Sequence, residues 1–226
     1  MRYALIPARG GSKRIPRKNI RNFAGRPMIE LPITSCQDSG LFDDIFVSTD
    51  SDEIADTADK LGAKVIWRAV EFADDFSTTT EVLQDALTSH LQHLVDSDWL
   101  YKIYATSPVT SELVKDFVEY AEKDDEKFCA SVGKFKNHIQ RALVGSLEAG
   151  LDFTQPLHAN SRSQDLFESY FDAGKLYAAR TSKWRQITNP LLEAPRGFLL
   201  PTWASVDIDN EDDWRLAELL FSELRD

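Results

Sequence analysis

Short apolar runs alternate with segments of helical periodicity along much of this 226-residue chain. Residues 3–6, 45–48, 64–67 and 100–104 are typical of buried strands, and residues 28–39, 52–61, 80–94 and 112–123 have the apolar spacing of helices. A strand, a helix and a second strand in succession form a right-handed crossover that joins parallel strands. The order therefore predicts an α/β fold built on a mainly parallel sheet.

The alternation breaks between residues 128 and 177. This stretch is β-like and irregular, and it is punctuated by Gly133, Gly145, Gly150, Pro156 and Gly174. A mixed sheet or a projecting hairpin explains the change, and a projecting arm is a common device for dimerisation. A last helix is expected at residues 211–224, with Asn210 or Asp209 as its N-cap. Because the chain has no long linker, repeat or low-complexity tract, we expect one domain with a projecting element.

The composition is that of a globular protein, with 42% hydrophobic and 28% charged residues. No apolar run approaches the roughly 20 residues that span a bilayer, and the first strand follows Met1 without a signal-peptide pattern. Cys36 and Cys129 lie in apolar surroundings and offer neither a disulfide framework nor the spacing of metal ligands. We therefore expect a soluble, cytoplasmic protein with no membrane partner.

The charge is distributed very unevenly. The first 26 residues carry eight Lys and Arg and no acid, whereas the remaining 200 carry 18 bases and 37 acids, a net charge of −19. The overall charge of −11 argues against a general nucleic-acid binder. A basic tail is the alternative explanation of the first segment, but a tail would not contain a strand-like run followed by two glycines. We therefore predict a local anion site there.

The anion site is expected in the turn that directly follows the first strand. Ligands of open α/β sheets bind at the carboxyl ends of the strands. Gly10 and Gly11 allow backbone N–H groups to approach an anion, and Arg9, Lys13 and Lys18 supply compensating charge. The turn has neither the Gly-Lys-Ser/Thr order of a Walker A loop nor a GxGxxG fingerprint. It is best interpreted as a cradle for a triphosphate or polyphosphate.

A pair of carboxylates near the C-terminus is a candidate metal site. Asp207 and Asp209 are two residues apart on an expected strand, so both side chains should project from one face. Carboxylate oxygens, waters and substrate phosphates are the ligands that Mg²⁺ prefers. The alternative is an acidic cap of the last helix, to which Glu211, Asp212 and Asp213 would contribute. We expect both roles, because Asp207 lies outside the cap region.

Arg68 ends a strand and is followed by a cluster of hydroxyl side chains at residues 77–79. These groups are suited to hydrogen bonds with a base edge or a phosphate. Alternatively, the hydroxyls cap the helix expected at residues 80–94, which we predict for one of them. Asp50 also follows a strand, and its alternative role is that of an acid at the N-terminus of the next helix.

The turn and several later segments resemble the signature of the CMP-sialic acid synthetases and their relatives, which are cytidylyltransferases for nine- and eight-carbon keto-sugar acids. The resemblance rests on Arg9-Gly10-Gly11-Ser12-Lys13 with Pro16, Lys18 and Asn19, on Val47-Ser48-Thr49-Asp50-Ser51-Asp52, on Arg68 with Asp74-Asp75-Phe76-Ser77-Thr78-Thr79, on Thr106-Ser107-Pro108 and on Asp207-Ile208-Asp209. The pseudaminic acid branch is resembled more closely, through Ile15-Pro16-Arg17-Lys18, Ile103-Tyr104, Asn160-Ser161-Arg162-Ser163-Gln164-Asp165-Leu166 and Tyr170-Phe171-Asp172-Ala173-Gly174.

The resemblance implies a three-layer, Rossmann-like nucleotidyltransferase fold. It implies a single cytidylyltransferase domain over residues 1–226, with about 135–165 as a projecting dimerisation element. Asn19, Arg68 and Thr79 would surround the cytosine, and Ala8, Gly10, Gly11 and Ser12 would contact the nucleotide. The catalytic set would be Arg9, Lys13, Lys18, Asp207 and Asp209, with Mg²⁺ on the two aspartates. The partners would be CTP, a keto-sugar acid and a second copy of the chain in a homodimer. Exchange of the arms would place Arg162 or Lys136 near the site of the other subunit.

The sugar acid needs a positioned cation for its carboxylate, and Arg162 is the best candidate. A role as an ordinary surface-loop residue is the alternative for Arg162. Gln164 would meet hydroxyl or acetamido groups, Tyr104 and Tyr170 would supply apolar walls, and Asp172 and Lys175 complete the predicted substrate site. Lys175 departs from the branch, whose members generally have an uncharged residue such as Gln there. The sugar that the site accepts is therefore left open.

The predicted reaction joins CTP to a nonulosonic acid, most closely pseudaminic acid, and releases pyrophosphate. Alternatives within the class are a CMP-sialic, CMP-legionaminic or CMP-octulosonic acid synthetase. A non-catalytic module that binds nucleotide sugars is an alternative from another class, although a pure binder has little need of the Asp207 and Asp209 pair. The resemblance suggests that the product serves glycosylation of flagella or of surface polysaccharide.

Overall fold

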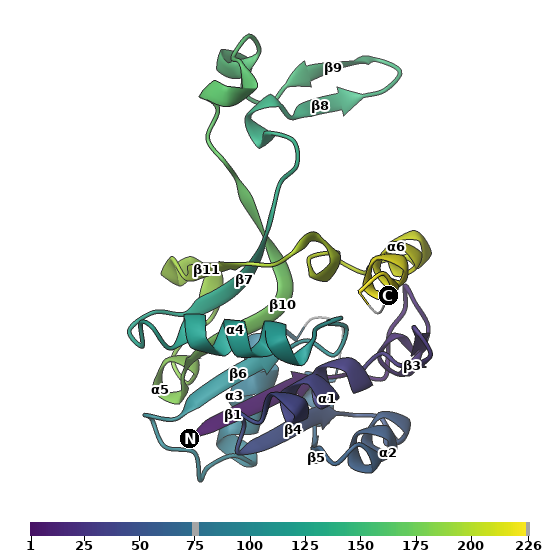
Figure 1. Cartoon of the computed structure of the whole chain (residues 1–226), viewed down its shortest axis with the longest axis vertical. Coiled ribbons are helices and arrows are strands. Elements are labelled where there is room, and N and C mark those ends of the chain that lie inside the picture. The colour runs from purple at the N-terminus through teal and green to yellow at the C-terminus, as the bar shows by residue number, and fades with distance from the viewer. Residues whose placement is uncertain (74–76, 225–226) are drawn as a thin grey trace.

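The computed structural model describes residues 1–73 and 77–224. Its centre is a seven-stranded sheet in the order β11-β7-β10-β6-β1-β4-β5 (Figure 1). The strands are β1 (Arg2–Pro7), β4 (Asp44–Thr49), β5 (Lys64–Trp67), β6 (Trp99–Ile103), β7 (Cys129–Lys134), β10 (Tyr170–Arg180) and β11 (Arg196–Leu199). Two small hairpins, β2 (Asn22–Phe23) with β3 (Arg26–Pro27) and β8 (Leu143–Ser146) with β9 (Gly150–Phe153), lie outside this sheet.

The direction of the strands confirms a mainly parallel, mixed sheet. The pairs β1–β4, β1–β6, β4–β5 and β7–β11 are parallel, whereas β10 runs antiparallel to both β6 and β7. The reversal falls within the stretch where the sequence loses its alternation of strand and helix. The predicted change of pattern near residue 128 therefore marks the insertion of β10 between β6 and β7.

Helices cover both faces of the sheet, which confirms the three layers. They are α1 (Glu30–Ser39), α2 (Asp52–Lys60), α3 (Thr79–Ser89), α4 (Ser111–Ala121), α5 (Thr181–Trp184) and α6 (Glu211–Ser222). Side chains of β1 alternate between the faces: Ala4 and Ile6 join one core with α1, α2 and α4, whereas Tyr3 and Leu5 join another with α3 and α5. Short 3₁₀ helices are η1 (Lys18–Ile20), η2 (Val70–Phe72), η3 (Ile139–Arg141), η4 (Pro156–His158), η5 (Ser163–Asp165), η6 (Pro190–Glu193) and η7 (Thr202–Ala204).

Two sequence predictions about elements are wrong. The helix predicted at 80–94 ends at Ser89, because His90 leaves helical geometry, although the apolar side chains of Leu91 and Leu94 are buried as their spacing suggested. The segment 206–209 is not a strand, because it packs beside the turn after β1 rather than beside a strand with which it could form a ladder. The side chain of Ile208 in this segment is nevertheless buried, whereas those of the flanking Asp207 and Asp209 are more accessible.

A third core fastens the C-terminal helix to the N-terminal turn. Trp214 and Phe221 of α6 pack on Phe23, with Ile15 and Ile208 in the same buried cluster. In Figure 1, α6 and the chain end lie beside β3. The cap prediction is confirmed for Asn210, whose side chain accepts hydrogen bonds from the first turn of α6. The turn after β1 and the C-terminal helix are thereby brought together.

Residues 135–169 form an arm that projects from the sheet between β7 and β10 and carries β8 and β9 (Figure 1). This segment contains the element predicted at 135–165. It exposes large apolar side chains, namely Leu143, Val144, Leu147, Leu151, Leu157 and Phe167. No helix among the described residues has the length and apolar character required to traverse a bilayer.

Replacement of Trp214 by Ala tests the third core. The indole is 2% exposed, contacts Phe23 edge to face and lies under the Arg21 guanidinium. Its removal should lower the free energy of unfolding by about 3–5 kcal/mol in urea titrations. Trp67→Ala is the matched control, because Trp67 is 51% exposed and its loss should cost about 1 kcal/mol or less. Equal losses in the two variants would contradict the packing assigned to α6.

Candidate active site

A cavity of about 460 Å³ opens at the carboxyl ends of β1, β5 and β6. Its wall consists of side chains from the turn after β1, from the segment after β5, from the start of α3 and from the segment after β6. The lining residues are Pro7, Arg9, Ser12, Lys13, Arg14, Lys18, Asn19, Arg68, Ser77, Thr79, Val82, Tyr104 and Thr106. The structure thus brings together seven of the predicted nucleotide- and phosphate-site residues with the predicted sugar residue Tyr104.

The turn after β1 is held by hydrogen bonds within the protein. The Gly10 N–H donates to Asp50 Oδ1 over 2.8 Å, and a Cβ at Gly10 would lie 2.9 Å from the Cβ of Ser51. A glycine is therefore required for close approach of the two segments. The Asn19 amide donates to the Arg9 carbonyl. Ala8 is buried, and its N–H donates to the Ser48 carbonyl.

The cradle that faces the cavity is consequently made mainly of side chains. Among the described residues, Ala8, Gly10 and Gly11 do not line the cavity, whereas Ser12 and four cations do. The predicted use of the Gly10 N–H for an anion is not what the structure has, since a carboxylate occupies it. Asp50 therefore supports the turn from behind.

The cationic end of the cavity adjoins the acidic pair. Arg14 forms an ion pair with Asp209 at 2.6 Å, and the Lys18 ammonium donates to the Ile208 carbonyl. Burial lowers the pKa of Lys18, while the carboxylates of Asp209 and Asp207 oppose that shift. The turn and the acidic pair therefore lie next to one another. This is the arrangement that the sequence predicts for a site that binds a nucleotide and a cation.

The acidic pair has the donor set of a Mg²⁺ site. The Asp207 and Asp209 side chains are 71% and 42% exposed, so their oxygens are accessible to a ligand. Asp213 is not part of the pair, because its carboxylate accepts the Asp209 and Asn210 N–H groups in the cap of α6. No cluster of three His, Cys, Asp or Glu side chains suited to a metal occurs in residues 1–73 and 77–224. Two carboxylates without a third fit an ion that keeps waters and phosphates as ligands.

Arg68 and the hydroxyl cluster lie at the other end. The Arg68 guanidinium donates to the Ser48 carbonyl over 3.1 Å, and burial lowers its pKa. Its Nε is buried and has no hydrogen-bond partner among the described residues. Thr78 forms a capping box with Glu81, which confirms a capping role for one of the three hydroxyls. Asp74, Asp75 and Phe76 of the motif lie outside the described residues.

Two lysines are buried in strands near the cavity. Lys175 in β10 is 1% exposed, with its ammonium 4.0 Å from Asp207 Oδ1 and 3.4 Å from the Thr106 carbonyl. Lys102 in β6 is 3% exposed and donates to Thr79 Oγ1 over 3.0 Å. Burial lowers the pKa of each to about 8. Both positive charges therefore lie behind the wall that Thr79, Tyr104 and Thr106 present.

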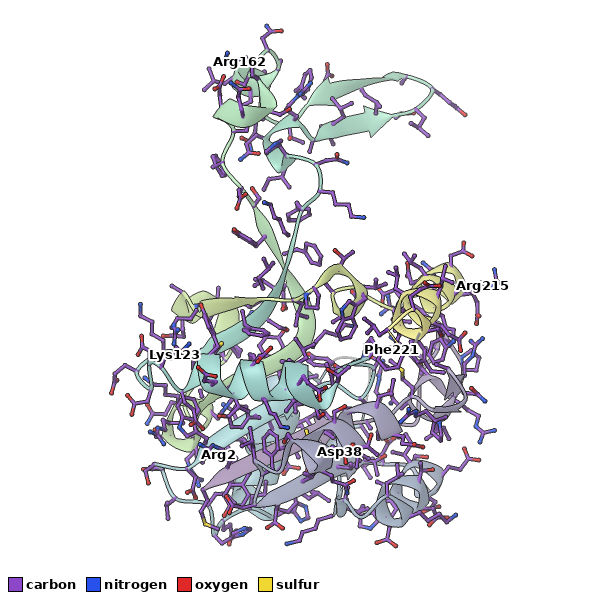
Figure 2. All side chains as sticks on the ribbon, in the orientation of Figure 1. Arg2, Asp38, Lys123, Arg162, Arg215 and Phe221 are labelled. Carbon is purple, nitrogen blue, oxygen red and sulfur yellow. The ribbon has the colours of Figure 1, made fainter. Side chains whose placement is uncertain are left out.

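The remaining predicted sugar residues divide into two groups. Asp172 lies near the buried lysines, and its carboxylate accepts hydrogen bonds from the Tyr177 hydroxyl and the Gly174 N–H. Arg162 is paired with Asp165 at 2.7 Å, and Figure 2 shows it at the far end of the arm. The structure does not bring Arg162, Gln164 or Tyr170 to the cavity of their own chain, because none of the three lines it.

Sequence reasoning missed Arg14 and Lys102. Arg14 was noted only as one of eight bases, and its pairing with Asp209 depends on the distant fold of α6. Lys102 carried a readable signal, because it interrupts the apolar strand of residues 99–103. A charged side chain in a strand buried on both faces is rare unless it has partners.

Comparison with known proteins agrees with this geometry. Residues 3–186 match the family described as Cytidylyltransferase. The chain belongs to the cytidylyltransferase family. The resemblance that the turn and the acidic pair suggested is thereby confirmed, and the chain is an enzyme of the nucleotidyltransferase class.

Curated cytidylyltransferases are similar over nearly the whole length of this one. A pseudaminic acid cytidylyltransferase of Campylobacter jejuni is 35% identical over 219 residues, which are 96% of this chain and 94% of that protein. The CMP-N,N'-diacetyllegionaminic acid synthase of Legionella pneumophila is 32% identical, with the same coverage. Among solved structures, CMP:2-keto-3-deoxy-manno-octonic acid synthetase complexed with CTP has a TM-score of 0.69 at 16% identity and covers 99% of both chains. This likeness confirms the cytidylyltransferase fold.

Replacement of Lys102 by Met tests the cost of burying its ammonium. Because burial lowers its pKa from 10.5 to about 8, the folded chain binds fewer protons than the unfolded chain between these values. The stability of the wild type should therefore rise relative to Lys102→Met as the pH increases from about 8 to 10.5, by up to about 3 kcal/mol. Urea titrations of both proteins over this interval measure the difference. A difference that stays constant with pH would show that the ammonium is hydrated in the folded enzyme.

Proposed function

We propose that this cytidylyltransferase couples CTP to a nonulosonic acid, with pseudaminic acid as the preferred sugar, and releases pyrophosphate. The observation that carries the proposal is the cavity in which the basic turn adjoins the acidic pair at the carboxyl edge of the sheet. The preference for pseudaminic acid is supported by the C. jejuni relative that bears this name and by the branch motifs around Ile15, Arg162 and Asp172.

CTP would lie with its phosphates toward the cations of the turn. Arg9, Lys13, Arg14 and Lys18 line that end of the cavity with Ser12, and these four positive charges would balance the four negative charges of a triphosphate. The base would lie toward Arg68, Thr79 and Asn19, whose donors and hydroxyl match the edge of a cytosine. The buried Arg68 Nε supplies a donor that no described protein group takes.

Mg²⁺ would be held by Asp207 and Asp209, with phosphate oxygens and waters as its other ligands. When bound, the ion lowers the charge on the α-phosphate. Before the nucleotide binds, Arg14 and Lys175 neutralise the two carboxylates. When CTP binds, Arg14 would move from Asp209 toward a phosphate. This move would leave the Asp209 carboxylate free to hold the metal ion.

The reaction needs orientation more than covalent help from the protein. The anomeric hydroxyl oxygen of the sugar acid bonds to the α-phosphorus, the bond to the pyrophosphate oxygen breaks, and the hydroxyl proton passes to solvent or to a nearby carboxylate. Fixed cations around the phosphates stabilise the charge that develops on the leaving pyrophosphate. Tyr104, Asp172 and Lys175 would form the sugar end beside Asp207.

The arm would complete the sugar site of a second subunit in a homodimer. The exposed apolar side chains of the arm would be buried by a second subunit. The arm also contains a cavity of about 470 Å³ whose lining includes Lys136, His138 and Arg141. A sugar carboxylate needs such cations. Arg162 would act in the partner's site rather than in its own, which is consistent with its place at the far end of the arm in Figure 2 and with its absence from the lining of the cavity of its own chain.

CMP-sialic, CMP-legionaminic and CMP-octulosonic acid synthetases are the competing assignments. Release of pyrophosphate from CTP, measured with a panel of pseudaminic, legionaminic, sialic and octulosonic acids, decides among them. The highest kcat/KM is expected with pseudaminic acid. No release with any sugar would favour a module that only binds nucleotide sugars.

Replacement of Asp209 by Ala should reduce turnover by about a hundredfold or more at ordinary Mg²⁺ concentrations, because the pair loses one of its two carboxylates. The fold should persist, since the cap of α6 depends on Asn210 and Asp213. Asp212→Ala is the matched control, because it removes the same charge from the first turn of α6 at a side chain that is 91% exposed. Near wild-type rates in Asp209→Ala would reduce the pair to a helix cap.

Mixing of two inactive variants tests the exchange of arms. In a dimer of Asp209→Ala with Arg162→Ala, crossed arms leave one site with both native residues. Co-expression should therefore restore about one quarter of wild-type activity, because half of the dimers are mixed and each has one intact site. If the arm serves its own chain, every site keeps a defect and no activity returns. Light scattering of the wild type measures the dimer directly.

A further inference from the structure

Lys102 is a buried cation that the roles assigned above do not use. Its ammonium lies 4.1 Å from the centroid of the Tyr177 ring, 5.3 Å from that of Tyr104 and 5.6 Å from that of Trp184. No carboxylate forms an ion pair with it among the described residues, and Asp172 is the charged group that acts on it from a distance. Aromatic faces and one hydroxyl therefore take the place of a counter-ion. Such a group is costly to bury.

The ammonium starts a chain of hydrogen bonds that ends at the cavity wall. Lys102 Nζ donates to Thr79 Oγ1 over 3.0 Å, and Thr79 Oγ1 lies 2.9 Å from the Tyr104 hydroxyl oxygen. Thr79 and Tyr104 both line the cavity. The chain thus connects a charge behind the wall with two hydroxyl groups in it.

Counting donors shows what this chain leaves available to a ligand. An ammonium only donates, so one lone pair of Thr79 is occupied whenever Lys102 is protonated. If the Thr79 hydroxyl donates to Tyr104, the Tyr104 proton remains for a ligand. If Tyr104 donates to Thr79, the Thr79 proton remains instead. In either arrangement, one hydroxyl proton is left over for the cavity, and the Lys102 ammonium occupies the Thr79 lone pair that would otherwise let the pair accept a hydrogen bond from a ligand.

We propose that Lys102 is a positioning residue that makes the Thr79–Tyr104 pair a hydrogen-bond donor to an acceptor oxygen of the keto-sugar acid. The inference rests on the proposed function and deepens it. The Tyr104 N–H donates to the carbonyl of Lys175, whose ammonium faces Asp207. Burial raises the pKa of Tyr104, and the carboxylates of Asp172 and Asp207 add to that shift. The Tyr104 hydroxyl therefore lies between Thr79, at the base end, and the acidic side of the cavity, where the attacking hydroxyl of the sugar must lie. A sugar acid with carboxylate and amide oxygens offers acceptors there.

A double-mutant cycle between Lys102 and Tyr104 tests the proposal. Lys102→Met keeps the length of the side chain and removes the donor, and Tyr104→Phe removes the terminal hydroxyl. Each should raise the KM for the sugar by about tenfold, the value of one hydrogen bond, with the KM for CTP changed less than about twofold. The double variant should be no worse than Tyr104→Phe alone, because both changes break one chain.

A second variant keeps the test independent of how Lys102→Met folds. Thr79→Val removes the middle hydroxyl at nearly constant volume. Because Thr79 also faces the base, this variant should raise the KM for CTP as well, but its effect on the KM for the sugar should not add to that of Tyr104→Phe. Lys60→Met is the control for the chemical change, because Lys60 lies exposed at the end of α2. Thermal melting of each variant compares their folded states.

Three results would overturn the proposal. One is a set of effects that multiply in the double variants, which would mean that Lys102 acts on stability alone. Another is a loss in Lys102→Met or Tyr104→Phe that falls on the KM for CTP, which would assign the chain to the nucleotide. The third is an unchanged KM for the sugar in Lys102→Met. If the wild type is active, that result would overturn the role of Lys102 and leave the proposed function intact. A wild-type enzyme that releases no pyrophosphate with any sugar would instead overturn the proposed function, and this inference with it.

Discussion

The site depends on the packing of Ile208 and α6 against the turn after β1. Ile208 and Trp214 are buried with Phe23 and Ile15 in one core, and Arg21 pairs with Glu211 at 2.6 Å across the same contact. This core joins segments that are about 190 residues apart in the chain. It holds a turn with a strong positive charge beside a segment with a negative one. Neither segment belongs to a regular strand, so apolar burial rather than a hydrogen-bonded ladder fixes their separation.

The contact also explains how the basic turn and the acidic pair can lie together while both remain accessible to ligands. Arg14 and Lys18 lie between the cavity and Asp207 and Asp209, and they hold the acidic pair in place before a nucleotide arrives. In the proposed reaction, a triphosphate would offer these cations better partners and leave the exposed carboxylates of Asp207 and Asp209 free to hold a metal ion. The ion pairs cost little to exchange because Arg14 and Asp209 are both substantially exposed. A more deeply buried pair would oppose binding.

The parts of the fold and site that sequence revealed are those encoded locally. Strand periodicity placed β1, β4, β5 and β6 within two residues, and the glycine turn and Asp207 with Asp209 were recognisable from order and spacing. The use of the Gly10 N–H by Asp50 was not, because that contact depends on how β4 lies beside β1. The segment 206–209 alternates like a strand, yet it has no strand beside it. Alternation records which side chains are buried, and here Phe23 and Trp214, not a sheet, bury Ile208.

The two ends of the cavity are built by different physical means. The nucleotide end uses cations on a turn, where water keeps each charge at low cost and the sequence motif shows them together. The end that we propose for the sugar has Lys102 and Lys175, which are single cations within apolar strands and are buried behind Thr79, Tyr104 and Thr106. A buried charge acts strongly on its few neighbours because little solvent screens it. It can therefore influence whether the hydroxyl groups of the cavity wall donate or accept hydrogen bonds, although the charge itself does not contact the ligand. Under the proposed function, a change at either lysine would alter recognition of the sugar while the phosphate motif stays the same. The turn would then identify the family, and the buried lysines of the strands would influence the choice of sugar.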